Sequence, residues 1–171
     1  MVKILFSKDD IEKRVSEIAA QISRDFKGKD VVMVAVLRGS FVFFADLIRM
    51  LDFDFSVDFI SLSSYIGTFS QGDVKKIYGL QENLSGKDVI IVEDIVDTGR
   101  TLDFLFKEFS FKNPRSLSAC ALLNKKCARI IDVPVKYFCF ETGNDFVVGY
   151  GLDYNGLYRG LPYIAKFLGK K

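Results

Sequence analysis

Residues 89–101 hold the densest group of side chains in this sequence that could bind or transform a ligand. An apolar run ends in two adjacent carboxylates, Glu93 and Asp94, and a turn of small and polar residues, 97–101, precedes a segment with helical character. Such a turn presents unpaired backbone N–H groups and the positive end of a helix dipole, which favour a phosphate. The paired carboxylates could hold ribose hydroxyls or a metal ion. The structural alternative is that they end a strand and the turn caps the next helix.

Two other positions follow apolar runs in the same way. Gly39, after residues 31–36, would let the backbone approach an anion closely, and Arg38 could supply a charged donor there. Lys125 follows the run 119–123, although the usual role of a single lysine is surface solvation. Residues 65–75 are polar and rich in small side chains, which predicts a long exposed loop, and such loops often act as lids.

Composition narrows the chemistry further. The chain contains no histidine, which excludes Ser-His and Cys-His catalysis and the commonest zinc sites, so acid–base work falls to carboxylates, Lys or Tyr. Its three cysteines form no CxxC pair and suit reduced thiols in a cytoplasmic protein, with Cys120 and Cys139 expected to be buried. The 24 basic and 22 acidic residues give a net charge of +2, which demands neither nucleic acid nor a membrane as partner.

The pattern of apolar residues predicts the elements that must position these groups. Ser7 and Asp10 indicate a helix start, and an apolar face then recurs at helical spacing as far as Gly28. Apolar runs at 31–36, 57–62, 89–92 and 117–123 predict strands buried on both faces, with helical segments near 41–51 and 102–109 between them. This alternation predicts one doubly wound α/β domain over residues 1–171 with a mostly parallel sheet flanked by helices. Ligands bind such sheets at the carboxyl ends of the strands, where the groups above lie.

Residues 89–101 resemble the phosphoribosyl pyrophosphate binding motif of the type I phosphoribosyltransferases. Four further segments are similar, in order and spacing, to the hypoxanthine-guanine branch of that family: VLRGS at 36–40, SY at 64–65, LNK at 123–125 and FVVGYGLDY at 146–154. The resemblance covers nearly the whole chain. It implies a fold with a small hood and a flexible lid loop. It also implies transfer of the phosphoribosyl group from phosphoribosyl pyrophosphate to hypoxanthine or guanine, as in purine salvage.

The same resemblance assigns the donor site. The ribose and 5'-phosphate would be bound by Glu93, Asp94, Asp97, Thr98, Gly99, Arg100 and Thr101. Asp97 would also face N7 of the purine and exchange its proton, which makes it the expected catalytic residue. The pyrophosphate would be bound by Arg38, Gly39, Ser64, Tyr65 and Arg159. An unusual peptide bond is expected before the basic residue of this loop, and Arg38 stands where many relatives carry lysine.

Purine binding and the cofactor follow from the C-terminal match. Lys125 would donate to O6 of the base, Phe146 would stack on its ring, Val147 would offer backbone contacts, and Asp153 would complete the set. The structural alternatives are a core phenylalanine and an aspartate in a turn before Asn155. Mg²⁺ is the implied cofactor, held by Glu93, Asp94 and Asp153, because it needs few protein ligands when it neutralises pyrophosphate.

Two other functions compete with this interpretation. A dinucleotide-dependent oxidoreductase or a nucleotide hydrolase could share the fold, but neither GxGxxG after a strand nor GxxxxGK[ST] occurs. An RNA-binding regulator related to the phosphoribosyltransferases should show a basic face, which the balanced charge does not favour. The resemblance also implies a homodimer or homotetramer paired through residues 41–51, and from the charge balance we expect no nucleic-acid or membrane partner. The choice among hypoxanthine, guanine and xanthine stays open.

Overall fold

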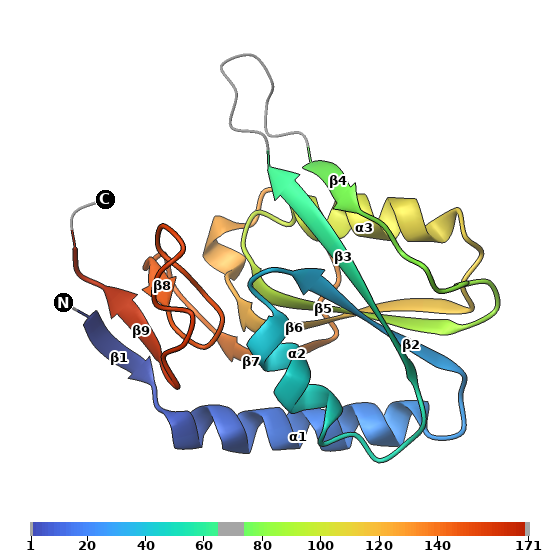
Figure 1. The fold of residues 1–171 in the computed structure, drawn as a ribbon, viewed down its shortest axis with the longest axis horizontal. Coiled ribbons are helices and arrows are strands. Elements are labelled where there is room, and N and C mark those ends of the chain that lie inside the picture. Colours follow the sequence, from blue (N-terminus) through green and yellow to red (C-terminus); the bar gives the residue numbers. More distant parts are fainter. Residues whose placement is uncertain (1, 65–73, 170–171) are drawn as a thin grey trace.

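A six-stranded sheet forms the centre of the computed structural model, which describes residues 2–64 and 74–169 (Figure 1). The strand order is β4-β3-β2-β5-β6-β7. Neighbouring strands pair in parallel from β3 to β7, and β4 pairs antiparallel with β3 at the edge. The strands are β2 (Val31–Leu37), β3 (Ser56–Ser64), β4 (Val74–Tyr78), β5 (Asp88–Val96), β6 (Ser116–Asn124) and β7 (Tyr137–Glu141). The predicted mostly parallel α/β sheet is confirmed.

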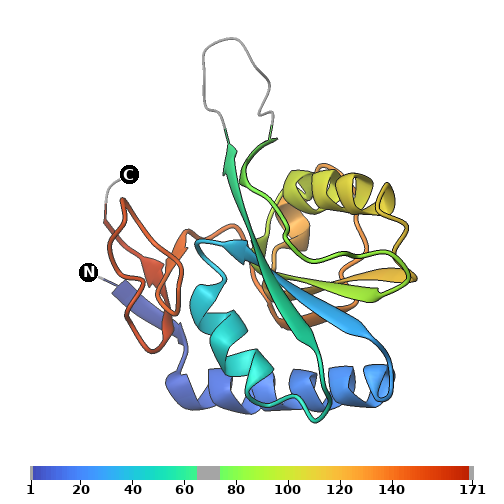
Figure 2. The same cartoon turned by 45° about the vertical axis from the view of Figure 1, so that its right-hand side comes forward.

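Helices cover both faces of the sheet, as a doubly wound fold requires (Figures 1 and 2). The helices α1 (Lys8–Phe26) and α2 (Phe41–Ile48) lie on one face, and α3 (Arg100–Ser110) lies on the other. A hydrophobic core lies on each face of the sheet, and alternate residues of β2 point into one or the other. Met33 packs in the core with α1 and α2, whereas Val34 packs in the core with α3. A strand buried on both faces must be apolar at every position, which is why the sequence shows continuous runs.

The start of α1 is set by the predicted capping residues. The Ser7 hydroxyl accepts a hydrogen bond from the Asp10 N–H at 3.2 Å, and the Asp10 carboxylate accepts one from the Ser7 N–H at 3.0 Å. Two N–H groups at the helix start are thereby satisfied. The helix then buries the predicted face, made of Ile11, Val15, Ile18, Ala19, Ile22 and Phe26.

Three of the predicted elements differ in detail. Val57 and Phe59 of β3 are 41% and 38% exposed, so β3 is not buried on both faces as predicted, although Phe44 of α2 packs against Phe59. The helix predicted to reach residue 51 ends at Ile48. Val74 and Lys75, predicted as loop, begin β4, which pairs with β3. The rest of the predicted lid loop, residues 65–73, lies outside the described part of the chain.

A separate three-stranded sheet joins the two ends of the chain beside the main sheet (Figures 1 and 2). It consists of β1 (Val2–Phe6), β9 (Ile164–Phe167) and β8 (Val147–Val148), paired antiparallel in the order β1-β9-β8. This sheet and the loops between β8 and β9 form the hood implied by the resemblance, although its strands were not predicted. Among the described residues, no helix is long and apolar enough to cross a membrane.

Candidate active site

The predicted site residues meet at the carboxyl edge of the main sheet. The chain leaves β2 toward β3 on one side and leaves β5 toward β6 on the other, so the loops after β2 and β5 diverge. Divergence at such a switch point leaves a crevice where ligands bind. Arg38 and Gly39 follow β2, Asp97 follows β5, and Lys125 follows β6. The topology therefore brings together groups that are far apart in the sequence.

The phosphate loop, residues 97–101, runs from β5 into α3. Gly99 is the N-cap of α3, with φ of 87° and no side-chain cap, and the Arg100 N–H donates to the Thr98 hydroxyl at 3.4 Å. The N-terminus of a helix presents backbone N–H groups that can bind an anion. A Cβ on Gly99 would lie 2.3 Å from the Ile131 carbonyl oxygen, so a larger residue does not fit. A cavity of about 60 Å³ opens here, lined by Glu93, Ile95, Val96, Asp97, Thr98, Gly99, Thr101 and Leu102. Arg100 starts the helix but is not among these lining residues.

Of the two carboxylates beside the loop, Glu93 is buried and Asp94 is partly exposed. Glu93 is 6% exposed, and its Oε2 has no hydrogen-bond partner among the described residues. Burial next to Asp94 raises the pKa of Glu93 well above its usual value. Burial also raises the pKa of Asp94 to about 6, although the Ile95 N–H donates to its Oδ1 at 2.9 Å. The Oδ1 of Asp97 is likewise buried without a partner in this part of the structure. Such oxygens suit a ligand that supplies hydroxyl groups or a cation.

Gly39 packs tightly between two other parts of the site. The Leu37–Arg38 peptide before it is cis, which confirms the unusual peptide implied by the resemblance. A Cβ on Gly39 would stand 1.5 Å from Oδ2 of Asp94, and a Cβ on Gly151 would stand 2.2 Å from the Gly39 carbonyl oxygen. The loop after β2 thus touches both the carboxylate pair and the hood. Of the other predicted pyrophosphate residues, Ser64 ends β3, and Tyr65 lies outside the described residues.

All four predicted purine residues line one cavity of about 220 Å³ next to the phosphate loop. Its lining consists of Asp94, Ile95, Asp97, Lys125, Asp145, Phe146, Val147, Leu152 and Asp153. The Lys125 ammonium lies 3.5 Å from the Asp145 carbonyl oxygen, at the limit of a hydrogen bond. The expected catalytic residue and the expected base-binding residues therefore face the same space.

Aromatic residues of the hood support Phe146, which is 36% exposed. Its ring makes edge contacts with Tyr154 at 5.7 Å and Phe167 at 6.2 Å between ring centroids, and these two rings stack on each other at 4.4 Å. Edge-to-face neighbours restrict the plane of the Phe146 ring. The sequence did not identify Phe167 as part of the site, because no motif marks it and β9 was not recognised.

Asp153 and Arg159 form an ion pair at the rim of the site, with Nη2 of Arg159 2.7 Å from Oδ1 of Asp153. The Gly156 N–H also donates to Oδ2 of Asp153 at 2.7 Å, so the structural alternative of a turn is also present. Arg159 donates further to the Gly151 carbonyl at 2.6 Å. Within residues 2–64 and 74–169, no group of three or more His, Cys, Asp or Glu side chains is arranged to hold a metal ion.

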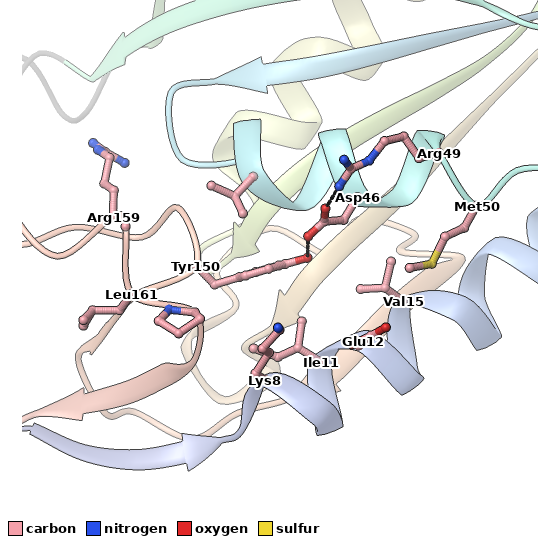
Figure 3. A pocket seen from close by; sticks show the side chains of 13 residues that line it. Lys8, Ile11, Glu12, Val15, Asp46, Arg49, Met50, Tyr150, Arg159 and Leu161 are labelled. Atoms are coloured by element: carbon pink, nitrogen blue, oxygen red, sulfur yellow. Dashed lines mark hydrogen bonds and ion pairs between the residues drawn. The ribbon is translucent and has the colours of Figure 1, made fainter.

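A larger cavity of about 430 Å³ lies between α1, α2 and the hood (Figure 3), and neither Glu93 nor Asp94 lines it. In Figure 3, Tyr150 extends from the hood toward α2, where its hydroxyl donates to Oδ2 of Asp46 at 2.7 Å. Asp46 also pairs with Arg49 of the same helical turn. Of the predicted site residues, Arg159 is the one that reaches this cavity in the described structure. The hydrogen bond from Tyr150 fastens the hood to the helix that follows the Gly39 loop.

The fold and the site define a doubly wound α/β protein with a helix that begins at Gly99 and the carboxylates of Glu93 and Asp94 at its switch point. The family model for the phosphoribosyl transferase domain matches residues 1–155, and the chain belongs to this family. It is 44% identical over 170 residues to the hypoxanthine phosphoribosyltransferase of Escherichia coli (strain K12), covering 98% of this chain and 96% of the relative.

Two other relatives agree over nearly the full length. The hypoxanthine-guanine phosphoribosyltransferase of Streptococcus thermophilus (strain CNRZ 1066) is 42% identical over 164 residues, which cover 95% of this chain and 91% of that protein. A crystal structure of a hypoxanthine-guanine phosphoribosyltransferase from Bacillus anthracis superposes with a TM-score of 0.93 at 45% identity. This match covers 98% of this chain and 100% of the other.

Proposed function

We propose that this protein transfers the 5-phosphoribosyl group from phosphoribosyl pyrophosphate to hypoxanthine or guanine, giving IMP or GMP and pyrophosphate in purine salvage. The observation that carries the proposal is the meeting of Asp97, Lys125 and Phe146 around one cavity beside the phosphate loop. The relatives that match nearly the full chain are named as enzymes of this reaction.

The donor occupies the crevice between the loops after β2 and β5. Backbone N–H groups of the phosphate loop and the hydroxyls of Thr98 and Thr101 bind the 5'-phosphate. Glu93 and Asp94 accept hydrogen bonds from the ribose hydroxyls. The pyrophosphate is bound by Arg38, Gly39, Ser64, Tyr65 and Arg159.

The reaction breaks the bond between C1' of the ribose and the pyrophosphate oxygen, and a purine nitrogen forms the new bond to C1'. Positive charge develops on the ribose as the leaving group departs, and the carboxylates of Glu93 and Asp94 stabilise it. Asp97 takes up the N7 proton, since its Oδ1 has no internal donor among the described residues. Lys125 donates to O6, and Phe146 stacks on the ring. Hypoxanthine, guanine and xanthine all present O6, so Lys125 does not distinguish them.

Mg²⁺ is the proposed cofactor, with Glu93, Asp94 and Asp153 as its protein ligands. Among the described residues, Oε2 of Glu93 is buried without a partner, which suits a cation. Magnesium commonly keeps several waters and takes one or two carboxylates beside substrate phosphates, so the three side chains need not bind it at once. When bound, the ion neutralises the charge that gathers on the departing pyrophosphate.

The protein is proposed to act as a homodimer or homotetramer of single-domain chains spanning residues 1–171. Large apolar side chains on α2 and β3 are exposed, among them Phe41 at 46% and Val57 at 41%. Apolar side chains that cluster at the surface mark an association surface. The free thiols of Cys120, Cys127 and Cys139 fit a reducing compartment, which favours the cytoplasm.

A spectrophotometric assay tests this function. Purified protein is given Mg²⁺, phosphoribosyl pyrophosphate and, in parallel, hypoxanthine, guanine, xanthine or adenine. Turnover of hypoxanthine or guanine, with adenine inert, is the expected result and ranks the bases. Absence of turnover with all four bases, from folded protein, would overturn the proposal and favour the RNA-binding regulator, which at present has no support from the relatives.

A further inference from the structure

The segment after β6 lies directly behind the phosphate loop. This segment, residues 125–131, is called the brace here and contains the short 3-10 helix η1 (Lys126–Ala128). The Lys125 N–H donates to the Val96 carbonyl at 2.9 Å, and the N–H groups of Ile130 and Ile131 both donate to the Thr98 carbonyl at 3.0 Å. The backbone of the brace therefore holds the carbonyl groups of Val96 and Thr98.

Arg129 supplies the remaining contacts between the brace and the loop. Its Nε donates to the Asp97 carbonyl at 3.2 Å, and its Nη2 donates to the Val96 carbonyl at 3.4 Å and to Oδ1 of the buried Asn124 at 2.6 Å. Its Nη1 donates to the Val133 carbonyl at 3.3 Å. All of these acceptors are uncharged oxygens, so none of them neutralises the guanidinium.

The brace packs directly against the phosphate loop at Gly99. A Cβ on Gly99 would stand 3.0 Å from the Arg129 Cδ, in addition to its clash with the Ile131 carbonyl. Close packing of this kind restricts the backbone of the loop to the conformation that the hydrogen bonds specify.

These bonds also decide which way the N–H groups of the loop point. In a trans peptide unit the carbonyl of one residue and the N–H of the next point in opposite directions. The brace donates hydrogen bonds to the carbonyl groups of Val96, Asp97 and Thr98, which therefore point toward it. The N–H groups of Asp97, Thr98 and Gly99 are consequently turned away from it. The cavity of about 60 Å³ that these residues line is where the 5'-phosphate is proposed to bind.

We propose that Arg129 is a positioning residue for the donor phosphate: it fixes the carbonyls of the phosphate loop so that consecutive N–H groups face the anion. Its charge, which no acceptor neutralises, adds attraction from behind the loop. The inference rests on the proposed function only in naming phosphoribosyl pyrophosphate as the donor. Binding of any 5'-phosphorylated pentose tests the geometry directly.

Variants at Arg129 separate positioning from charge. Arg129→Ala should raise both KM for phosphoribosyl pyrophosphate and the Kd for ribose 5-phosphate about tenfold, equivalent to about 1.4 kcal/mol, and leave KM for hypoxanthine nearly unchanged. Arg129→Lys restores the charge but cannot span the acceptors of a planar guanidinium, so it should show most of the same defect. Arg129→Gln offers a further uncharged variant if the alanine variant does not fold.

Added guanidinium ion provides the sharpest readout. A cavity of about 340 Å³ lined by Arg129, Asn124 and Val133, among others, gives a small cation access to the vacated position. Guanidinium at concentrations well below denaturing should lower the raised KM and Kd of Arg129→Ala, while an equal concentration of ammonium should not.

The matched control is Arg115→Met. Arg115 pairs with the buried Asp88 at the opposite end of β5, so its loss destabilises the sheet without touching the loop. The inference is overturned if folded Arg129→Ala binds ribose 5-phosphate like the wild type, or if Arg115→Met weakens that binding equally. If the wild type transfers no phosphoribosyl group but Arg129→Ala still loses ribose 5-phosphate binding, the proposed function fails and the role of Arg129 stands.

Discussion

The substitution Gly39→Ala should inactivate the enzyme while leaving its fold almost intact. The new Cβ would stand 1.5 Å from Oδ2 and 2.4 Å from Cγ of Asp94, whereas ordinary contacts begin at 3.4 Å. The two groups must separate by about 2 Å, which is the difference between 3.4 and 1.5 Å. The backbone at Gly39 cannot easily retreat, because its carbonyl oxygen lies against Gly151. The Asp94 carboxylate therefore has to move.

That displacement sets the size of the effect. A misplacement of about 1 Å at a reacting centre can cost about 100-fold in rate, so kcat/KM for phosphoribosyl pyrophosphate should fall at least about 100-fold. The moving atoms are the end of a side chain, so the free energy of unfolding should change by no more than about 1 kcal/mol. Initial-rate kinetics and urea denaturation measure the two quantities.

Gly86→Ala is the opposite control. Gly86 has φ of +74° before β5, and nothing lies within 4 Å of the point that a Cβ would occupy. Alanine there should cost about 1–2 kcal/mol of stability without loss of activity. Folded Gly39→Ala with wild-type kcat/KM would refute the reasoning. The reasoning would also be refuted if Gly39→Ala lost activity only because its free energy of unfolding had fallen so far that the protein no longer folds.

The other predictions concern the carboxylates and the lysine. Asp97→Asn should lower kcat about 100-fold or more with donor binding little changed, and equal turnover would remove its proton role. Lys125→Ala should raise KM for hypoxanthine and guanine about tenfold and weaken discrimination against adenine. Unchanged purine kinetics would show that the base does not bind beside Lys125. Because burial raises the pKa of Asp94 from 3.8 to about 6, its ionisation costs stability as the pH rises through this range, by up to about 3 kcal/mol. The urea midpoints of Asp94→Asn and wild type should coincide near pH 4, and the variant should have the higher midpoint at about pH 7.5. A difference between the two midpoints that does not change with pH would contradict this.

Four of the six strands of the main sheet, β2, β3, β5 and β6, and the polar groups that follow them could be predicted because each leaves a local pattern, whereas β4 and β7 were not predicted. Strands such as β2 and β5 are buried on both faces and read as unbroken apolar runs, and the residues after them are polar. The strands of the hood leave no such pattern: β8 has two residues, and the burial of β1 and β9 depends on their pairing across the whole chain. The same limit applies to the site. Asp97 belongs to a motif, whereas the bonds of Arg129 exist only once the brace folds behind the loop.

The pairing of β1 with β9 has a consequence for synthesis of the chain on the ribosome. β1 precedes every strand of the main sheet in the sequence, its partner β9 follows all of them, and β9 lies between β1 and β8 in the hood sheet. The main sheet can form earlier, since β2 to β7 precede β8 in the sequence. A nascent chain would thus hold a formed phosphate loop while Phe146 still lacks its neighbour Phe167. The chain would therefore complete the site for the base after the phosphate loop, once β9 has been made and has paired with β1.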